Sequence, residues 1–531
     1  MLAASARPSA SATKTLARAG SPINPATAAT STSPSTTPLY GADVSMPTET
    51  MGRQGGGVTD GVEARGPVAD AGTGQGAGAL VAICVAYFMV ILDATVVNVA
   101  LPALGRGLHT TTSGLEWVVD AYSLAFAALL LSAGALADRR GAKAVFQSGV
   151  ALFTAASVAC GLAPSTAALV AARAIQGVGA ALAVPASLAL LQAAYRDQAA
   201  RRRAFGIWGG VAGIAAGAGP VLGGALVSEL GWRTVFFVNL PIAAVGLTLG
   251  ARHLPSPSPR AHGVDPAGQA AGVVALAALT AALIEAGSLG WASTVVLGGL
   301  GVVAVSTAAF VAIEHHAGAP MLPLRLFASA GFSAATTVGL LINLGFYGEL
   351  FVWSLYLQQV DHLSPLLAGV ALLPQMAMAV VGSTVSGRVM ARRGPRLPML
   401  AGLAAGTVGL AALGVAAGPQ RPYWPVAAAM VAVGFGMSFT MPAATAAVME
   451  AAPTERSGLA SGTLNAARQV GVVIGVALLG TLVAHQAGFL GGLRAAMAIA
   501  AAAFALGGLL TALGVARPAT SAGFDPARRR R

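Results

Sequence analysis

Apolar segments long enough to cross a lipid bilayer follow one another from residue 79 to about residue 516, with short polar loops between them. A membrane-spanning helix needs about 20 mainly apolar residues, because it must satisfy its backbone hydrogen bonds without water. Charged residues make up only 9% of the chain, so we expect an all-α integral membrane protein. The fourteen expected helices cover residues 79–101, 115–137, 144–163, 166–194, 204–228, 234–252, 268–287, 294–314, 331–358, 365–391, 397–417, 424–449, 458–485 and 491–515.

Basic residues predict the orientation of these helices. Twenty Lys and Arg residues fall in loops and tails on one side of the fourteen-helix arrangement, and four fall on the other. Cytoplasmic loops carry the excess of basic residues, so both termini are expected in the cytoplasm. Contact with anionic lipid headgroups then accounts for the net charge of +12, and no nucleic-acid partner is expected.

The N-terminal region differs in composition from the rest of the chain. Residues 1–78 are rich in Ala, Ser, Thr, Pro and Gly, and such a segment cannot bury enough apolar surface to fold. We therefore expect a disordered cytoplasmic tail. A transit peptide is one alternative, and an over-extended start, with Met46 or Met51 as the true beginning, is another.

An internal repeat indicates two related halves. The segment 177–185 recurs as 434–442 with the spacing of two glycines and one proline preserved. Transporters are commonly built from such repeats, with the substrate site between them near the middle of the membrane. The expected parts are a six-helix half at 79–252, a linker with two inserted helices at 253–330, a second six-helix half at 331–516 and a basic cytoplasmic tail at 517–531.

Two charged residues within apolar segments need an explanation. A carboxylate at the centre of a membrane helix costs roughly 2.5 to 3.5 kcal/mol on insertion scales, so Asp93 is expected to face a polar cavity and to carry a proton or bind a cation. Arg173 keeps its charge at any accessible pH and requires acceptors or water. It either tunes the proton affinity of a nearby acid or bonds backbone carbonyls in a structural role.

Glu349 is the other main candidate for proton coupling or substrate binding. Polar and aromatic residues surround it in the sequence, and a carboxylate amid aromatic faces attracts an organic cation. The alternative is an acid near a helix end that extends to water. Asp120 lies beside Trp117 and Tyr122, which favours an interfacial position over a buried one. The candidate cavity residues are Asp120, Asn343, Tyr347, Tyr356 and Arg468.

Four motifs resemble those of the major facilitator superfamily, and within it the fourteen-helix drug:proton antiporter family. Residues 134–146 are similar to the G-x-L-A-D-R-x-G-r-k loop, with a departure at Ala142 where a basic residue is usual. Residues 173–179 resemble the R-x-x-Q-G-x-G element of helix four, and residues 92–102 resemble the first-helix motif of the fourteen-helix branch. The exporter signature G-P-x-x-G-G corresponds to Gly219, Pro220, Gly223 and Gly224.

This resemblance covers residues 79 to about 516 and implies the fold and the function. It implies two six-helix halves with two inserted helices, and export of drugs in exchange for protons. It also implies a gate in the loop after the second helix. The gating-loop candidates are Gly134, Asp138, Arg139, Gly141 and Lys143.

Other functional classes find no support in the sequence. The chain has no GxxxxGK[ST] phosphate loop and no HExxH or other metal-ligand spacing, so no enzyme activity, cofactor or metal is expected. A proton gradient is the expected energy source, and an amphipathic or cationic small molecule is the expected substrate. The alternatives are an uptake symporter on the same scaffold and a non-transporting membrane sensor. We expect a monomer in the plasma membrane.

Overall fold

The regular secondary structure of the described residues is helical throughout. The computed structural model describes residues 72–195, 197–256, 265–317, 322, 324–418, 422–453, 457–485 and 488–515. Within this part, fourteen helical spans are long and apolar enough to cross a membrane, which confirms the expected all-α membrane fold. The expected tails at 1–78 and 517–531 lie outside the described residues, except that 72–78 belong to the first helix.

Twelve of the spans are single helices, and two are each made of a short and a longer helix. The single helices are α1 (Gly72–Leu108), α2 (Thr112–Arg140), α3 (Ala142–Gly161), α4 (Thr166–Ala194), α5 (Gln198–Leu230), α8 (Pro266–Leu289), α9 (Thr294–His316), α10 (Ala330–Gln359), α13 (Arg396–Ala416), α14 (Tyr423–Ala451), α15 (Ser457–His485) and α16 (Phe489–Gly514). The split spans are α6 (Thr234–Phe237) with α7 (Asn239–His253), and α11 (Pro365–Ala371) with α12 (Leu373–Arg393), and a short 3-10 helix, η1 (Leu324–Ala328), precedes α10.

Prolines explain the two split spans. A proline inside a helix lacks the N–H donor, and its ring crowds the carbonyl four residues earlier. Pro241 follows the last residue of α6, Phe237, by four positions. Pro374 stands in the same relation to Val370, next to the end of α11. The apolar runs alone predict one continuous helix at each place, so these two breaks are a correction to that expectation.

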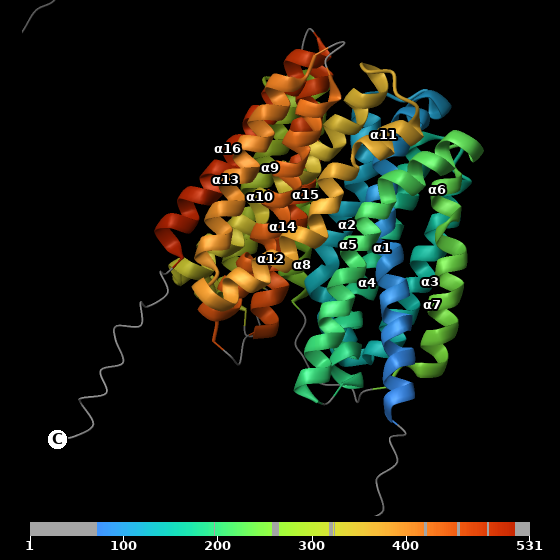
Figure 1. Ribbon diagram of the computed structural model, residues 1–531, viewed down its shortest axis with the longest axis vertical. Coiled ribbons are helices and arrows are strands. Elements are labelled where there is room, and N and C mark those ends of the chain that lie inside the picture. Colours follow the sequence, from blue (N-terminus) through green and yellow to red (C-terminus); the bar gives the residue numbers. More distant parts are fainter. Residues whose placement is uncertain are drawn as a thin grey trace, which may run out of the picture. The chain divides into compact units, whose positions relative to one another are not determined.

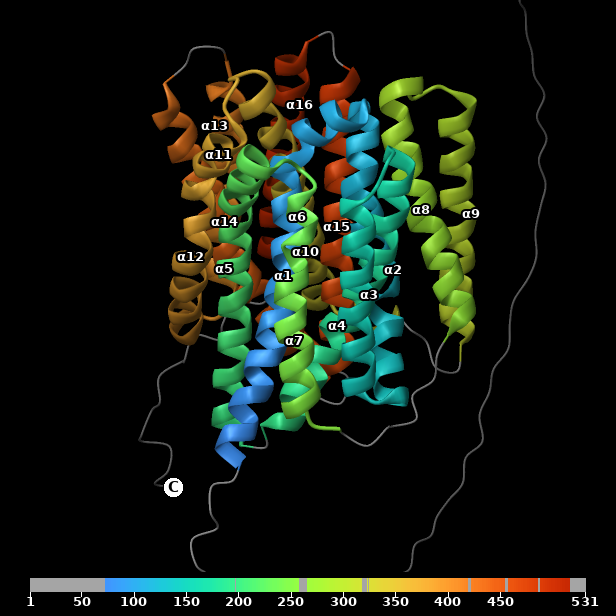
Figure 2. The same cartoon turned by 90° about the vertical axis from the view of Figure 1, so that its right-hand side faces the viewer.

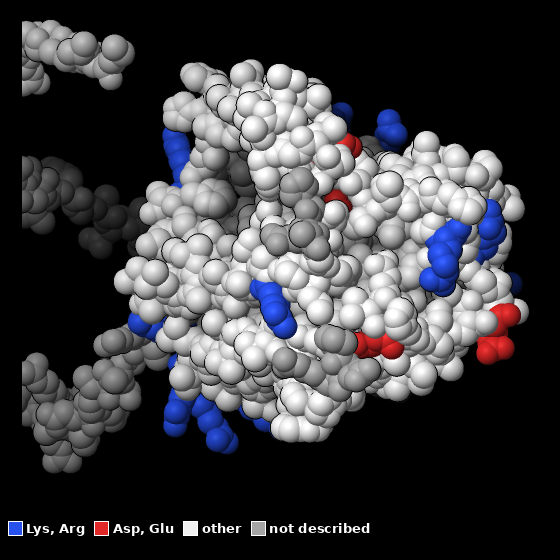
Figure 3. All heavy atoms as spheres, turned by 90° about the horizontal axis from the view of Figure 1, so that it is seen from above, with Lys and Arg blue, Asp and Glu red and all other residues white. Residues whose placement is uncertain are grey.

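Figures 1 and 2 show the helices packed side by side, with α1 beginning at the lower end. Among the N-terminal helices, α4 packs on α2 and α3, and α1 packs on α5 and α7. Among the C-terminal helices, α14 packs on α12 and α13, and α10 packs on α15 and α16. The two groups meet where α15 lies on α2, where α11 and α12 lie on α5, and where α1 meets α10. Seen from the end opposite to the start of α1, the surface is mostly uncharged (Figure 3).

The repeated glycine pairs explain how each group is packed. On α4, a Cβ at Gly177 would collide with the backbone of Tyr122 in α2, and one at Gly179 would lie 2.6 Å from the backbone of Phe153 in α3. On α14, the pair Gly434 and Gly436 meets the backbones of α12 and α13 in the same way. Absence of side-chain bulk lets membrane helices approach closely. The repeated segments 177–185 and 434–442 therefore make equivalent contacts, each with two neighbouring helices. We propose on this basis that the chain is divided into two related six-helix halves.

The inserted helices α8 and α9 form a hairpin at the edge of the bundle (Figure 2). Gln269 of α8 donates to the carbonyl of Ala128 on α2, at 2.5 Å, and is also hydrogen-bonded to Ser132. Near the other end of α8, Thr481 of α15 donates to the carbonyl of Leu283, at 2.7 Å. The hairpin thus contacts both groups of helices.

The glycine contacts predict a stability effect. Gly436→Ala places a methyl group 2.7 Å from the backbone of Gly406, and overpacking of this kind costs about 1–3 kcal/mol. The Tm of the purified protein should therefore fall by several degrees in a thermal unfolding assay. Gly213→Ala is the matched control, because open space surrounds Gly213 in α5. An unchanged Tm for Gly436→Ala would contradict the close contact.

Candidate functional site

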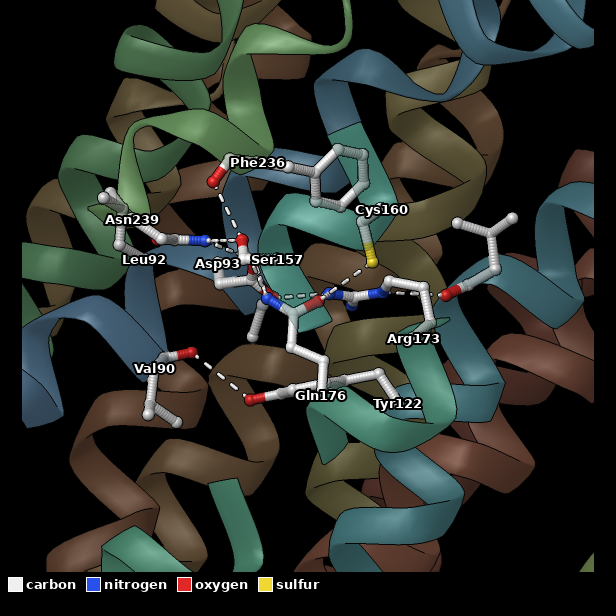
Figure 4. A network of polar contacts seen from close by, with 12 residues as sticks. Val90, Leu92, Asp93, Tyr122, Ser157, Cys160, Arg173, Gln176, Phe236 and Asn239 are labelled. Carbon is white, nitrogen blue, oxygen red and sulfur yellow. Dashed lines mark hydrogen bonds and ion pairs between the residues drawn. The ribbon is translucent and has the colours of Figure 1, made fainter. Parts of the chain in front are cut away.

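Asp93 lies within the first membrane span, on α1, and its side chain is fully buried, with 0% exposed. Its Oδ2 forms an ion pair with Nη1 of Arg173 on α4 at 2.5 Å (Figure 4), and Arg173 is 1% exposed. The sequence predicts acceptors or water for Arg173 and a polar cavity in front of Asp93. The structure pairs these two charges with one another, across 80 residues of chain.

Neutral donors complete the environment of the Asp93 carboxylate. Gln176 of α4 and Asn239 of α7 both donate to Oδ1, at 2.8 and 2.9 Å. Asn239 also donates to the hydroxyl of Ser157 on α3, which donates to the carbonyl of Phe236 at 2.8 Å (Figure 4). A buried charge is tolerated when it is paired and hydrogen-bonded. The carboxylate therefore joins α1 to α3, α4 and α7.

Arg173 has further contacts besides Asp93. Its Nε donates to the carbonyl of Val118 on α2 at 3.1 Å, and Nη1 also donates to Oε1 of Gln176 at 2.8 Å. The guanidinium lies over the ring of Tyr122, 4.4 Å from its centroid. Arg173 therefore contacts both an acid and a backbone carbonyl, the partners that its two alternative predicted roles require.

A cavity of about 1530 Å³ adjoins this network. Arg173 and Tyr122 are part of its wall, whereas Asp93 lies behind them and does not line it. On one side of the membrane domain the lining reaches the ends of α2, α4 and α14 and the beginning of α15, at Asp138, Gln192, Met449 and Leu459. The cavity thus extends to the same end of the bundle as the start of α1.

Contacts between the two groups of helices close the opposite end. Ser354 of α10 donates to the carbonyl of Asn98 on α1 at 2.7 Å, and Gln358 donates to that of Val99 at 3.0 Å. The N–H of Leu366 donates to the hydroxyl of Ser228 at 3.3 Å, which joins α11 to α5. In the described part of the chain, the two groups of helices thus meet at this end, and the cavity lies between them toward the other.

The exporter signature lies in this closed region. A Cβ at Gly219 would collide with Thr95 of α1, and one at Gly223 would lie 2.8 Å from Val96. A Cβ at Gly224 would lie 2.5 Å from the carbonyl oxygen of Pro365 in α11. In return, Gly369 of α11 meets the backbone of Pro220. The small residues therefore bring α5 against both α1 and α11.

Three of the predicted cavity residues, Asn343, Tyr347 and Arg468, line the cavity. Glu349 does not line it: the side chain is buried, and its Oε2 accepts a hydrogen bond from Gln375 of α12 at 2.7 Å. Tyr356, another predicted cavity residue, is also absent from the lining. Tyr356 donates to the carbonyl of Gly418 and packs on Trp353, with ring centroids 4.7 Å apart.

The interfacial position predicted for Asp120 is wrong. Asp120 is fully buried, because α15 and α8 pack along α2 and cover this part of it. Sequence analysis also missed Glu116, one helical turn earlier, which is equally buried and contacts the position of Gly480 in α15. No hydrogen-bond donor among the described residues reaches either carboxyl group. The signal available in the sequence is the i, i+4 spacing of two acids on one face of an apolar helix.

The loop after α2 is positioned by a glycine and a lysine. Gly141 has a φ of +93°, a conformation that favours glycine, and it ends α2 and begins α3. Lys143 donates to the carbonyl of Ala251 near the end of α7, at 3.0 Å. Gly134 and Asp138 line the cavity, and Arg139 is not part of its lining.

An aromatic pair in the cavity wall was not among the predicted residues. Tyr87 of α1 and Trp208 of α5 are stacked, with centroids 3.9 Å apart and an interplanar angle of 8°. Two aromatic residues 121 positions apart carry no local sequence pattern, so only the packing of α1 on α5 brings them together.

Comparison with known proteins identifies related sequences along most of the chain. The family model of the Major Facilitator Superfamily matches residues 83–476 and 362–530. The methylenomycin A resistance protein of Bacillus subtilis is 37% identical over 441 residues, which are 83% of this chain and 95% of that protein. The methylenomycin A resistance protein of Streptomyces coelicolor is 39% identical over 76% of this chain and 85% of its own length. The multidrug resistance protein Stp of Mycobacterium tuberculosis is also 39% identical, over 76% of this chain and 75% of that protein.

Solved structures share the fold. A bacterial homolog of the human lysosomal transporter Spinster, in an inward-facing and unoccupied conformation, has a TM-score of 0.59 at 16% sequence identity. The alignment covers 84% of this chain and 100% of that one. At this identity the likeness concerns the fold alone.

The ion pair predicts a thermodynamic coupling between α1 and α4. Arg173→Met leaves the Asp93 charge buried without its cation, and breaking a buried pair by removing one partner costs about 3–5 kcal/mol. The Tm of this variant should fall strongly, and adding Asp93→Asn should restore much of the loss. Arg252→Met, at the exposed end of α7, is the matched control. Equal Tm values for Arg173→Met and the double variant would contradict the coupling.

Proposed function

The chain belongs to the Major Facilitator Superfamily, and from this premise we propose that it exports amphipathic small molecules, drugs and antibiotics among them, in exchange for protons. It is a multi-pass membrane transporter. Its relatives carry the names of drug and antibiotic resistance proteins, which supports export as the direction. Neither an uptake symporter nor a non-transporting sensor fits these relatives as well.

The observation that carries the proton-coupling proposal is the buried Asp93–Arg173 pair beside the cavity. A carboxylate inside a membrane protein is expensive and usually functional. Among the described residues, this pair joins a titratable group to a charged group of the cavity wall. A change in the protonation of Asp93 therefore acts directly on Arg173, a charged side chain of the cavity wall.

The proposed cycle begins with ionised Asp93 paired with Arg173. A proton that enters from the outward-open state binds a carboxylate oxygen of Asp93, and the ion pair is lost. Arg173 then lacks its partner between α1 and α4, which changes the balance between the two conformations. Release of the proton to the cytoplasm restores the pair. Only differential stabilisation of the two states moves the equilibrium, and loss of a buried pair supplies several kcal/mol.

The observed conformation fits the loading step of export. If the termini are cytoplasmic, as the basic loops predict, the cavity is open to the cytoplasm and the α1–α10 and α5–α11 contacts close the outer end. Substrate would enter the cavity in this state. The glycines of α5 would let the outer contacts separate, and the loop containing Asp138, Gly141 and Lys143 would act as the inner gate.

Glu349, buried against Gln375, is a second group that can take a proton, and it acts from the C-terminal helices. We take one chain in the plasma membrane as the transporting unit, since the whole cavity lies within it.

The test is transport in proteoliposomes with an imposed pH gradient. Asp93→Asn keeps the shape of the side chain but cannot exchange a proton, so coupled movement of dye and protons should fall by tenfold or more. Fluorescein and ethidium serve as reporters of opposite charge, and an internal pH dye follows the protons. Glu229→Gln, at the exposed end of α5, is the matched control. Undiminished coupled transport by Asp93→Asn would remove Asp93 from the mechanism.

A further inference from the structure

The charge that faces the interior of the cavity is positive. Arg468 lies on α15 and lines the cavity, and its Nη1 donates to the side-chain oxygen of Asn465 at 3.1 Å. No carboxylate among the described residues forms an ion pair with Arg468. In contrast, Arg173 in the same wall is neutralised by Asp93. Arg325 of η1 also belongs to the lining, but its side chain is exposed. In the interior, Arg468 is thus a cation that no described carboxylate neutralises.

The position of Arg468 is fixed by its neighbours. Its aliphatic stem packs beside Gly339 of α10, where a Cβ would lie 3.5 Å from Cγ of the arginine. Asn343, one turn further along α10, also lines the cavity. Tyr347 of α10 and, on the opposite group of helices, Tyr87 of α1 line the same cavity as Arg468.

Two buried donors of the cavity wall, the Nε of Arg468 and the indole Nε1 of Trp208, have no acceptor among the described residues. Trp208 is stacked on Tyr87, and Arg468 lines the same cavity, so both donors belong to one wall. A buried donor without an acceptor costs about 1–3 kcal/mol, and a ligand that supplies the acceptor recovers this energy.

The acids of the cavity lining lie near its mouth. Asp138, Asp265 and Glu314 stand at or next to the ends of α2, α8 and α9. Arg468 is eleven residues beyond Ser457, the first residue of α15, which at 1.5 Å per residue is about 16 Å along the helix axis. The interior of the cavity therefore differs in charge from its entrance.

We propose that the cavity binds organic anions, in which a planar apolar body carries a carboxylate or an enolate that Arg468 and Trp208 hold by donated hydrogen bonds. The inference rests on the proposed export function and names its substrate class. Tyr87 and Trp208 offer a flat surface for the apolar body, while a guanidinium is suited to bind a carboxylate through two of its donors. Of the candidate acids, Asp93 is already paired and Glu349 lies outside the cavity, so the carboxylates that a cation would meet stand at the mouth and not beside Arg468.

Equilibrium binding to the full-length protein in nanodiscs, without any gradient, tests the proposal. Fluorescein is the planar anion and ethidium the planar cation, each followed by fluorescence anisotropy. The wild type should prefer fluorescein. Arg468→Gln should weaken fluorescein binding by roughly tenfold or more, as expected for loss of a hydrogen bond to a charged group. Arg468→Lys keeps the charge but loses the paired donors, so it should retain only part of the affinity, and Arg468→Glu should reverse the preference toward ethidium.

Two further variants separate recognition from folding. Trp208→Phe keeps the stacked ring and removes the donor, so fluorescein binding should weaken by several-fold at unchanged Tm. Arg252→Gln, a matched change at an exposed site, should leave binding unaltered. Preference of the wild type for ethidium, or unchanged fluorescein binding in Arg468→Gln, would overturn the proposal. Fluorescein that binds through Arg468 but does not follow a pH gradient would support this inference while refuting proton-coupled export.

Discussion

The cost of placing charge in an apolar bundle governs the arrangement of the N-terminal helices. Asp93 and Arg173 can be buried because each neutralises the other, and because amides of Gln176 and Asn239 satisfy the remaining oxygen. The demand for those donors fixes how α1, α4 and α7 face one another. Arg173 also binds a carbonyl of α2, so the charge that lines the cavity is positioned by the same contacts that hold the helices together.

The fourteen-helix fold could be predicted from the sequence because of helix length and the need for internal hydrogen bonding. An apolar run of about 20 residues can cross a bilayer as a helix, which satisfies its own backbone hydrogen bonds, so fourteen such runs predict fourteen spans. The interruptions at Pro241 and Pro374 could have been predicted from the missing N–H donor, yet Pro102 and Pro220 stand inside continuous helices. Whether a proline breaks a helix depends on which neighbours satisfy the freed carbonyl, and that is a property of the packing.

Packing between helices likewise limits how much of the candidate site can be predicted from the sequence. A charge within an apolar run is visible in the sequence, so Asp93 and Arg173 could be named, but which face of a helix meets which neighbour could not. Asp120 was misplaced because α15 and α8 cover it. Glu349 was misplaced because its carboxyl group bonds Gln375 of α12 and does not line the cavity. The pairing of Tyr87 with Trp208 arises only from contact between α1 and α5.

The contact between α5 and α11 has a consequence for repeated motion. Gly224 lies against the carbonyl of Pro365, and Gly369 lies against that of Pro220, so main-chain atoms meet at both points, with the Leu366–Ser228 hydrogen bond nearby. Separation of these two helices leaves peptide oxygens that water can hydrate at once. A contact between main chains needs little side-chain rearrangement to re-form. This property suits an outer contact that, in the proposed cycle, breaks and re-forms with each molecule carried across the membrane.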